Sequence, residues 1–229
     1  MAKADFYQGT LDFPSLHLWG REDFFVSPSN KAAVGMIDAL SEQLPALLIV
    51  GAKGCGKTHL AHVFQESVFK KFRESAPMVQ GEGLSLSSVG GVLEKSRFAV
   101  VEDVGKNIDE EALFHLMNGV RNKRGVLLMT ARENYPAWGI RLPDLLSRLS
   151  ATPRAEIGMP DDTLMSAVWV KFFAERRLNI SPEAVSFLLK NAERSFGFAS
   201  LVAAAADKKA LSEKRGITIP LLKEVLNGM

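Results

Sequence analysis

The sequence has little of several features that would restrict its class. It contains 229 residues but only one cysteine, Cys55, so an internal disulfide is excluded. No apolar run approaches the ~18 residues that a membrane-spanning helix needs. The first ten residues, MAKADFYQGT, lack the apolar core of a signal peptide. We therefore expect a cytoplasmic protein with no membrane partner.

An excess of charge of one sign is lacking too. The 28 Lys and Arg nearly balance the 26 Asp and Glu, which gives a net charge of +2. Such a balance does not indicate a nucleic-acid partner by itself, although it allows a local basic patch. The 47% hydrophobic content provides for a substantial core, and the length suits one large domain with or without a small second one.

The most informative segment that is present runs from Gly51 to Thr58 (GAKGCGKT) and fits the phosphate-binding pattern G-x-x-x-x-G-K-[ST]. An apolar stretch, Ala46–Val50, precedes it, and an amphipathic stretch, His59–Lys71, follows it. Strand, glycine-rich turn and helix are the context that this motif needs. The backbone N–H groups of such a loop surround a phosphate, and the helix directs the positive end of its dipole at the same place.

Individual residues of this phosphate loop have expected roles. Lys57 would reach the β- and γ-phosphates, and the Thr58 hydroxyl would ligate Mg²⁺. We also expect Lys57 and the helix N-terminus to lower the pKa of the Cys55 thiol, so that its alkylation would block nucleotide binding. The remaining residues of the predicted phosphate site are Gly51, Lys53, Gly54, Gly56 and His59.

Acidic and hydroxyl side chains follow two further apolar strands. Phe98–Val101 leads into Glu102 and Asp103, a pattern in which Glu102 would face Mg²⁺ and Asp103 would polarise a water. Thr130 ends the apolar segment 125–130. It either hydrogen-bonds the γ-phosphate or the attacking water, because ligands meet the carboxyl ends of strands, or is there for its β propensity.

The pattern of elements predicts an α/β fold followed by a helical unit. Strands alternate with helices as far as residue 157, which implies a parallel sheet covered on both faces. Residues 74–91, rich in glycine and serine, are expected to form at most one short strand. After residue 160 only helices are predicted. We expect an arm at 1–19, an α/β domain at 20–159 and a small helical domain at 160–229.

Against this background, residues 142–149 (LPDLLSRL) resemble the L-P-D-L-x-S-R-L segment of the Hda family, AAA+ regulatory homologues of the bacterial replication initiator DnaA. The segment 24–33, with Phe25, Val26 and Asn30, is similar to the adenine-side motif of that family. Residues 56–60 (GKTHL) and 218–220 (TIP) match as well. The resemblance covers roughly residues 20–229.

The resemblance implies an AAA+ P-loop NTPase fold with a helical lid, an ADP or ATP cofactor, and Mg²⁺. It makes Arg148 an arginine finger, presented in trans to the nucleotide of a neighbouring subunit. The lid arginine that senses nucleotide in the family falls on Gly197, so Arg194, almost one helical turn earlier, is the candidate substitute. Whether the chain hydrolyses ATP itself is left open.

The N-terminal arm contains a second recognition motif. Gln8, Leu11 and Phe13 fit the Q-x-x-L-x-F pattern that binds sliding clamps, in which Gln bonds at a rim and the two apolar side chains fill a pocket. The alternative is that Leu11 and Phe13 pack on their own domain. The resemblance favours the β subunit of DNA polymerase III, the sliding clamp, as partner, and DNA is then contacted indirectly through the clamp.

Together these residues predict a regulator of replication initiation. Bound to the DNA-loaded clamp, it would stimulate hydrolysis of DnaA-bound ATP through Arg148. A homodimer is compatible with the resemblance. The expected lack of a C-terminal helix-turn-helix domain argues against an initiator. The alternatives are a helicase-loader-like AAA+ ATPase and a small P-loop kinase, although residues 159–229 lack the arginine cluster that such kinases use.

Overall fold

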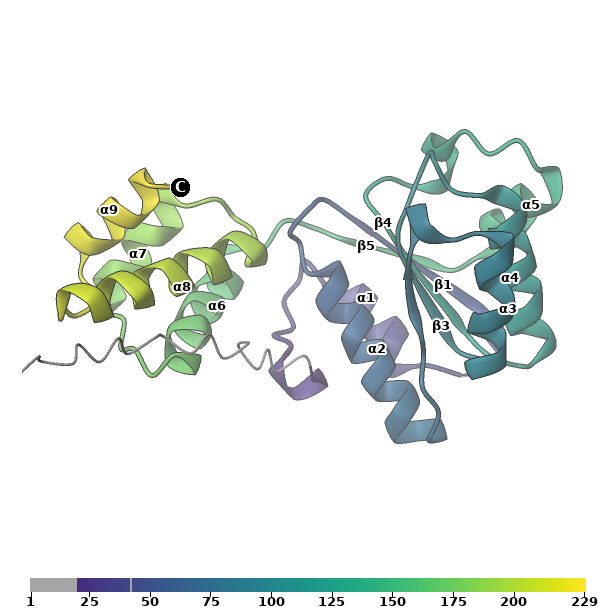
Figure 1. Ribbon diagram of the computed structural model, residues 1–229, viewed down its shortest axis with the longest axis horizontal. Helices are drawn as coiled ribbons and strands as arrows, with labels where there is room; N and C mark the ends of the chain where they lie inside the picture. The colour runs from purple at the N-terminus through teal and green to yellow at the C-terminus, as the bar shows by residue number, and fades with distance from the viewer. Residues whose placement is uncertain (1–19, 42) are drawn as a thin grey trace, which may run out of the picture.

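The computed structural model describes residues 20–41 and 43–229. The clamp-motif residues Gln8, Leu11 and Phe13 therefore lie outside the described residues. Two units are visible, a sheet with helices and a helical lid (Figure 1). In the part of the chain that is described, no helix combines the length and apolar character that crossing a bilayer requires.

The first unit is built on a parallel sheet in the order β2-β3-β4-β1-β5. The strands are β1 (Ala46–Gly51), β2 (Met78–Gln80), β3 (Ala99–Val104), β4 (Leu127–Ala131) and β5 (Arg154–Ile157). Every neighbouring pair is parallel, so the carboxyl ends of all strands lie at one end of the sheet. The chain returns between strands through helices, as parallel pairing demands.

Helices cover both faces of this sheet (Figure 1). One face carries α1 (Lys31–Asp38) and α2 (Lys57–Phe72). The other carries α3 (Leu86–Lys95), α4 (Glu110–Asn122) and α5 (Pro143–Ala151). Side chains alternate along β1, so that Leu47 and Ile49 join the first core while Leu48 and Val50 join the second.

Helix α3 was not predicted from the sequence. It occupies part of the segment 74–91 that we expected to be largely irregular. The helix begins with a capping box, in which the Ser85 and Ser88 side chains satisfy one another's backbone N–H groups. Val89 and Val92 then pack into the core shared with α4. This packing of an amphipathic face outweighs the weak helix propensity of the serines and glycines.

The second unit is the helical lid. It consists of α6 (Asp162–Glu175), α7 (Pro182–Asn191), α8 (Phe196–Glu213) and α9 (Ile219–Asn227). As predicted, α6, α7 and α9 begin at Asp161, Ser181 and Thr218, whose side chains accept hydrogen bonds from the helix N-termini. The four helices enclose a separate core that includes the fully buried Trp169 and Phe173. The prediction of a parallel α/β sheet with helices on both faces, followed by a helical lid, is confirmed.

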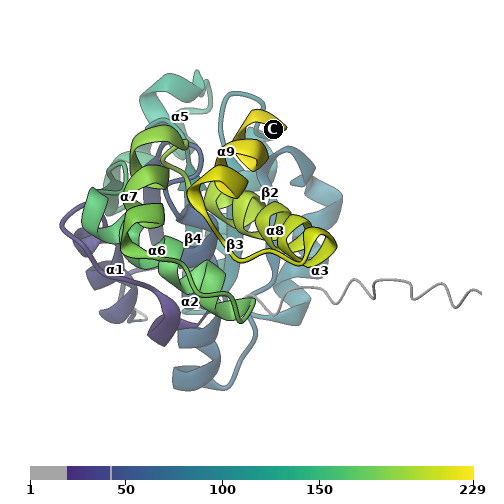
Figure 2. The same cartoon turned by 90° about the vertical axis from the view of Figure 1, so that its left-hand side faces the viewer.

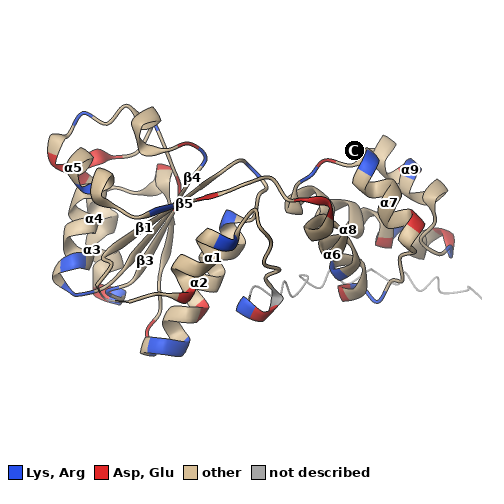
Figure 3. Ribbon diagram, turned by 180° about the vertical axis from the view of Figure 1, so that it is seen from behind, with Lys and Arg blue, Asp and Glu red and all other residues tan. Residues whose placement is uncertain are grey.

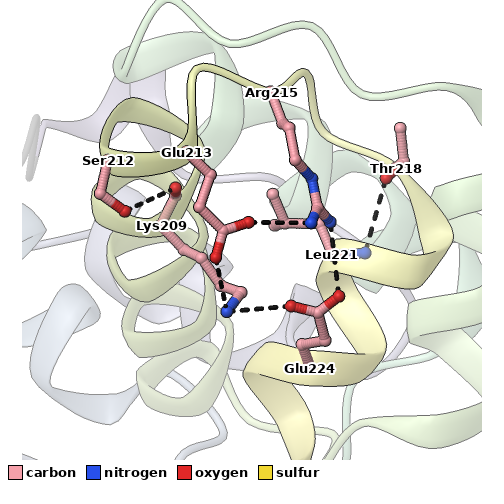
Figure 4. Close-up of polar contacts among 7 residues, drawn as sticks. All are labelled: Lys209, Ser212, Glu213, Arg215, Thr218, Leu221 and Glu224. Atoms are coloured by element: carbon pink, nitrogen blue, oxygen red, sulfur yellow. Dashed lines mark hydrogen bonds and ion pairs between the residues drawn. The ribbon is translucent and has the colours of Figure 1, made fainter.

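A ring of four charges joins the end of α8 to α9 (Figure 4). Lys209 Nζ lies 3.0 Å from the Glu213 carboxylate and 2.9 Å from that of Glu224. The Arg215 guanidinium contacts the same two carboxylates, at 2.9 and 3.4 Å. We call these four residues the lid ring. Each charge in it faces two of opposite sign, so the cations of the ring are neutralised within the lid.

Candidate nucleotide-binding site

A cavity of about 580 Å³ lies between the phosphate loop and the lid. The view from the lid side shows how the lid helices lie across this end of the sheet (Figure 2). Eight of the predicted site residues line the cavity: Phe25, Lys53, Gly54, Gly56, Lys57, Thr58, His59 and Asp103. The lid contributes side chains from α6 and α8, among them Leu164, Lys171 and Phe196. The cavity therefore depends on both units.

The phosphate loop has the backbone geometry that its glycines predict. Gly54 and Gly56 have φ angles of 80° and 104°, a region that residues with a Cβ rarely adopt. Gly56 precedes α2 without a capping side chain, and the first turn of α2 contains no acidic residue. The N-terminal N–H groups of α2 and its positive dipole end are thus available to an anion.

The lid contacts the loop directly. The backbone N–H of Phe196 donates to the Gly54 carbonyl at 3.1 Å. A Cβ at Gly54 would lie 2.3 Å from the Ser195 side chain, and one at Gly56 would lie 2.7 Å from the Phe196 ring. The two glycines are therefore required both for the turn and for the approach of α8.

Lys57 lies buried at the base of the loop. Its Nζ donates to the carbonyl oxygens of Gly51 and Ala52, at 2.8 and 2.9 Å, and the residue is 7% exposed. A buried ammonium held in this way is positioned to pair with a phosphate. Thr58 is the next residue and is exposed to the cavity.

The expectation for Cys55 is wrong. Cys55 does not line the cavity but is 2% exposed, in the core beneath the loop. Burial raises the pKa of its thiol, and the nearby Lys57 charge offsets this only in part. Gly51 is packed just as closely, because a Cβ there would lie 2.7 Å from Cys55 Sγ. The thiol is therefore poorly reactive, and alkylation at this position is not expected.

Residues predicted for the adenine side take two different positions. Phe25 lines the cavity, whereas Val26 is not among the lining residues and is 48% exposed. Asn30 is buried; its Nδ2 donates to the Phe25 carbonyl and its Oδ1 accepts from the Ser27 N–H, both at 2.9 Å. Asn30 thus holds the turn that presents Phe25. His59 packs edge to face on Phe24, with ring centroids 4.9 Å apart.

The two acids after β3 differ in their surroundings. Glu102 is 6% exposed and accepts a hydrogen bond from Gln80 of β2 at 3.3 Å. Asp103 is exposed and lines the cavity. Its φ of 51° and the irregular β3–β4 register between Val101 and Val104 turn its side chain outward. We expected Glu102 to face the metal, but the structure brings Asp103 to the cavity instead.

Arg132 is a site residue that sequence reasoning missed. Its Nη2 lies 3.1 Å from the Asp103 carboxylate, and it lines the same cavity. Thr130 holds the pair in place, because its buried Oγ1 accepts a hydrogen bond from the Asp103 N–H at 3.1 Å. Thr130 itself does not line the cavity. The available signal was the position of Arg132, directly after the end of β4 at the ligand edge of the sheet.

A divalent cation would need the nucleotide to complete its ligand set. Within the described residues, no group of three or more His, Cys, Asp or Glu side chains is placed to hold a metal ion. The Thr58 hydroxyl and the Asp103 carboxylate are the oxygen ligands that the cavity offers. Mg²⁺ is commonly bound by one or two protein oxygens together with phosphate oxygens, so the donor set fits Mg²⁺ bound with a nucleotide.

Arg194 is not brought to the cavity. Its guanidinium lies 2.6 Å from the Asp162 carboxylate and lines a different hollow, between α6 and α7. The expectation that Arg194 replaces the lid sensor is therefore not met. Gly197, at the family's sensor position, does line the nucleotide cavity.

Arg148 lies at the opposite end of the sheet. It is half-buried on α5, with its guanidinium stacked 5.2 Å from the Phe114 ring centre. It lines a surface hollow of about 690 Å³ beside Pro45 and Pro153, which precede β1 and β5. The phosphate loop follows the other end of β1. Six residues at ~3.3 Å each separate the two by roughly 17–20 Å, so Arg148 cannot reach the nucleotide cavity of its own chain.

Comparisons with known proteins agree with this architecture. Residues 169–226 match the family model described as the lid domain of Hda. An uncharacterised protein of Haemophilus influenzae is 27% identical over 190 residues, covering 80% of this chain and 82% of the relative. The DnaA of Cutibacterium acnes is 24% identical over 187 residues, covering 73% of this chain but 37% of the relative. The chain thus spans less than half the length of that initiator.

Solved structures give the same result for the fold. Domain III of Thermotoga maritima DnaA superposes with a TM-score of 0.80 at 17% identity, over 94% of this chain and 98% of that one. DnaA from Aquifex aeolicus with AMPPCP bound gives a TM-score of 0.68 at 16% identity, over 83% and 65% of the two chains. The fold is that of AAA+ P-loop proteins. Within that class, the lid resembles the lid domain of Hda, and the chain is similar to DnaA.

Proposed function

We propose that this chain binds an adenine nucleotide, ADP or ATP with Mg²⁺, in the cavity between the phosphate loop and the lid. Lys57, Thr58 and the N-terminal N–H groups of α2 hold the phosphates, and Phe25 with α6 and α8 encloses the base. The support is chemical: a buried ammonium, an uncapped helix N-terminus and glycines of positive φ surround one cavity.

The activity that follows is regulation of DnaA. Held at the DNA-loaded sliding clamp through Gln8, Leu11 and Phe13, the chain stimulates hydrolysis of the ATP bound by DnaA and so limits re-initiation. One observation carries this proposal: the half-buried Arg148 is placed at the end of the sheet away from its own nucleotide cavity. An arginine finger at this position would have to act on the nucleotide of a neighbour, whose hydrolysis it would accelerate by neutralising charge that spreads in the transition state.

The arrangement of the chain's own acids fits a control site better than a hydrolytic one. Asp103, the acid at the cavity, is already paired with Arg132. One oxygen of its carboxylate, Oδ2, is therefore already bonded to a cation, which competes with a role in directing a water. In this proposal the chain's own nucleotide sets the position of the lid, while the hydrolysis that matters occurs on DnaA.

The test is DnaA-bound ATP hydrolysis in the presence of DNA-loaded clamp. We expect Arg148→Ala to lose at least about a hundredfold of the stimulation, because a trans arginine contributes ~10³–10⁵ in rate. Arg141→Ala, an exposed arginine just before α5, is the matched control and should stimulate like the parent. Undiminished stimulation by Arg148→Ala would overturn the role. A clamp pull-down with Gln8→Ala tests the tether separately.

A further inference from the structure

The amino end of the sheet carries a concentration of positive charge. Three short segments meet there, each spanning the C-terminal end of a helix: 71–75 at α2, 94–97 at α3 and 121–124 at α4. We call these residues the cationic edge. Its seven cations are Lys71, Arg73, Lys95, Arg97, Arg121, Lys123 and Arg124, against two carboxylates, Glu74 and Glu94. The edge therefore has a charge of +5, whereas the whole chain has +2, which leaves −3 for all other residues.

These charges are for the most part not neutralised. Within the edge, Arg97 forms an ion pair with Glu74, at 2.9 Å. Lys95, Arg121 and Arg124 are exposed and pair with no described carboxylate. Figure 3 shows blue segments at the lower end of α2 and again below the label of α3. The lid ring shows the contrary case, in which the same chain neutralises its cations internally.

Hydrogen bonds and close packing join the segments of the edge to one another. Besides Glu74, the Arg97 side chain reaches the Arg124 carbonyl at 3.1 Å, so it links all three segments. Lys123 Nζ donates to the Leu93 carbonyl at 2.6 Å. A Cβ at Gly125 would lie 1.7 Å from the Arg97 carbonyl oxygen, which shows how closely two of the segments approach. A preorganised surface loses little entropy when it binds.

The composition of the edge selects the kind of partner. Phe72 is its only apolar residue, and the Arg97 guanidinium covers that ring at 5.5 Å. An amphipathic membrane site would insert an apolar face among lipids, and the edge residues offer none, so an anionic lipid surface would attract them by charge alone. Arginine forks, lysine ammonium groups and the polar Ser75 and Asn122 are groups that bind phosphate oxygens. Helix dipoles favour a cation near each helix end, but they do not require seven cations for three helices.

We propose that the cationic edge binds the phosphate backbone of double-stranded DNA directly. This contact would not depend on the DNA sequence, and it would add to the indirect contact with DNA that a sliding clamp provides. It goes beyond the proposed function, because neither Arg148 nor the clamp motif belongs to the edge. Arg121 belongs to the cationic edge and also lines the surface hollow that contains Arg148. DNA bound at the edge would therefore lie beside a partner protein bound at Arg148.

The test measures binding of the full chain to a labelled duplex of about 30 base pairs by fluorescence anisotropy, at about 50 to 200 mM salt. The edge variant carries Arg73→Gln, Lys95→Gln and Arg124→Gln. The control variant carries Lys190→Gln, Lys208→Gln and Lys214→Gln, which makes the same change of charge on the lid. Lys214, like Arg73 and Arg124, has a positive φ, so the control includes one such position against two in the edge variant.

We expect the parent to bind with an affinity that falls steeply with salt. The edge variant should bind about tenfold or more weakly at the lower salt. Its log–log salt slope should be smaller by about 2–3, because each cation that no longer meets a phosphate lowers the slope by ~0.9. The control variant should remain within about twofold of the parent. If the edge variant melts more than about 5 °C lower, Lys95→Gln alone is used, with an expected slope change of ~0.9.

Three results would overturn the proposal. The edge variant could bind DNA like the parent, or both variants could weaken equally, which would make the effect one of net charge alone. The parent could also bind phosphatidylserine vesicles and not duplex DNA, which would assign the edge to a lipid surface. The assay contains neither clamp nor DnaA, so its failure would leave the Arg148 experiment unaffected.

Discussion

The two ends of the parallel sheet differ in what they present. At the carboxyl end, the phosphate loop buries Lys57 against its own backbone, and the lid closes over the cavity. At the amino end, Arg148 lines an open surface hollow, and the cationic edge leaves most of its charge unpaired. In the proposed function, the first end is completed within the chain, whereas the second acts on partners. The comparison indicates how one sheet could separate binding of its own ligand from action on others.

The largest expected effect is on nucleotide affinity, which one substitution at each end of the sheet should change very differently. Lys57→Ala should weaken ADP or ATP binding by about 2–5 kcal/mol, roughly thirtyfold or more, because it removes a buried charge from the phosphates. Arg148→Ala should leave the nucleotide affinity within about twofold of that of the parent, since the other end of the sheet lies ~17 Å from the phosphate loop. Isothermal titration calorimetry checks both. Weaker binding by Arg148→Ala would show that the ends are not independent.

A second, smaller effect tests how tightly the lid closes the carboxyl end. Gly56→Ala should lower the free energy of unfolding by about 1–3 kcal/mol, because its φ of 104° strains a Cβ that would meet the Phe196 ring at 2.7 Å. Gly197→Ala, in α8, has open space and should instead raise it by about 0.5–1 kcal/mol through helix propensity. Urea unfolding measures both. Equal stability of the two variants would contradict the close approach of the lid.

The smallest expected effect is on the pH dependence of stability, and it concerns the paired charges of the lid ring, in contrast to the largely unpaired cationic edge. The Lys209 hydrogen bond lowers the pKa of the Glu224 carboxyl, and the same contact raises the pKa of Lys209. A lowered carboxyl pKa stabilises the fold above the unfolded-state value, and the contribution is lost as the pH falls through the folded-state pKa. The stabilisation by Glu224 should therefore be present near pH 7 and be lost progressively as the pH falls below the unfolded-state pKa of about 4.3.

The measurement is urea unfolding of the parent and of Glu224→Gln, each at neutral pH and in acid. The parent should be slightly the more stable near neutral pH, and the difference should vanish in acid. Glu193→Gln, at an exposed lid glutamate outside the ring, is the control and should show no such pH dependence. A difference for Glu224→Gln that is the same at both pH values would contradict the assignment to the ion pairs.

The sequence predicted most of the fold because its signals are local. The lid helices start at Asp161, Ser181 and Thr218 as expected, since a capping side chain acts on N–H groups only a few residues away. Helix α3 escaped prediction because its serines and glycines suggest a loop, and tertiary packing decides its state. The strand order could not be read from the sequence, because it depends on which strands meet after the helices fold back.

The candidate site was predicted less completely. The phosphate-loop residues fall where the motif places them, since a short motif with fixed backbone geometry determines its own shape. Arg132 and Asp103 meet only because β3 and β4 are neighbours, which no local pattern reveals. Burial also reversed the expected direction of the Cys55 pKa shift, because the motif gives the nearby charge but not the surrounding core.

The joint between the lid and the sheet constrains how the molecule can move. Only residues 158–161 connect β5 to α6, and the Gly158 N–H donates to the Ser29 carbonyl at 2.9 Å, next to the turn that carries Phe25. The second attachment is the hydrogen bond from Phe196 to Gly54. The first attachment lies next to Phe25 on one side of the cavity, and the second lies at the phosphate loop on the other. Any rotation of the lid relative to the sheet would therefore move the residues that line one side of the cavity or the other.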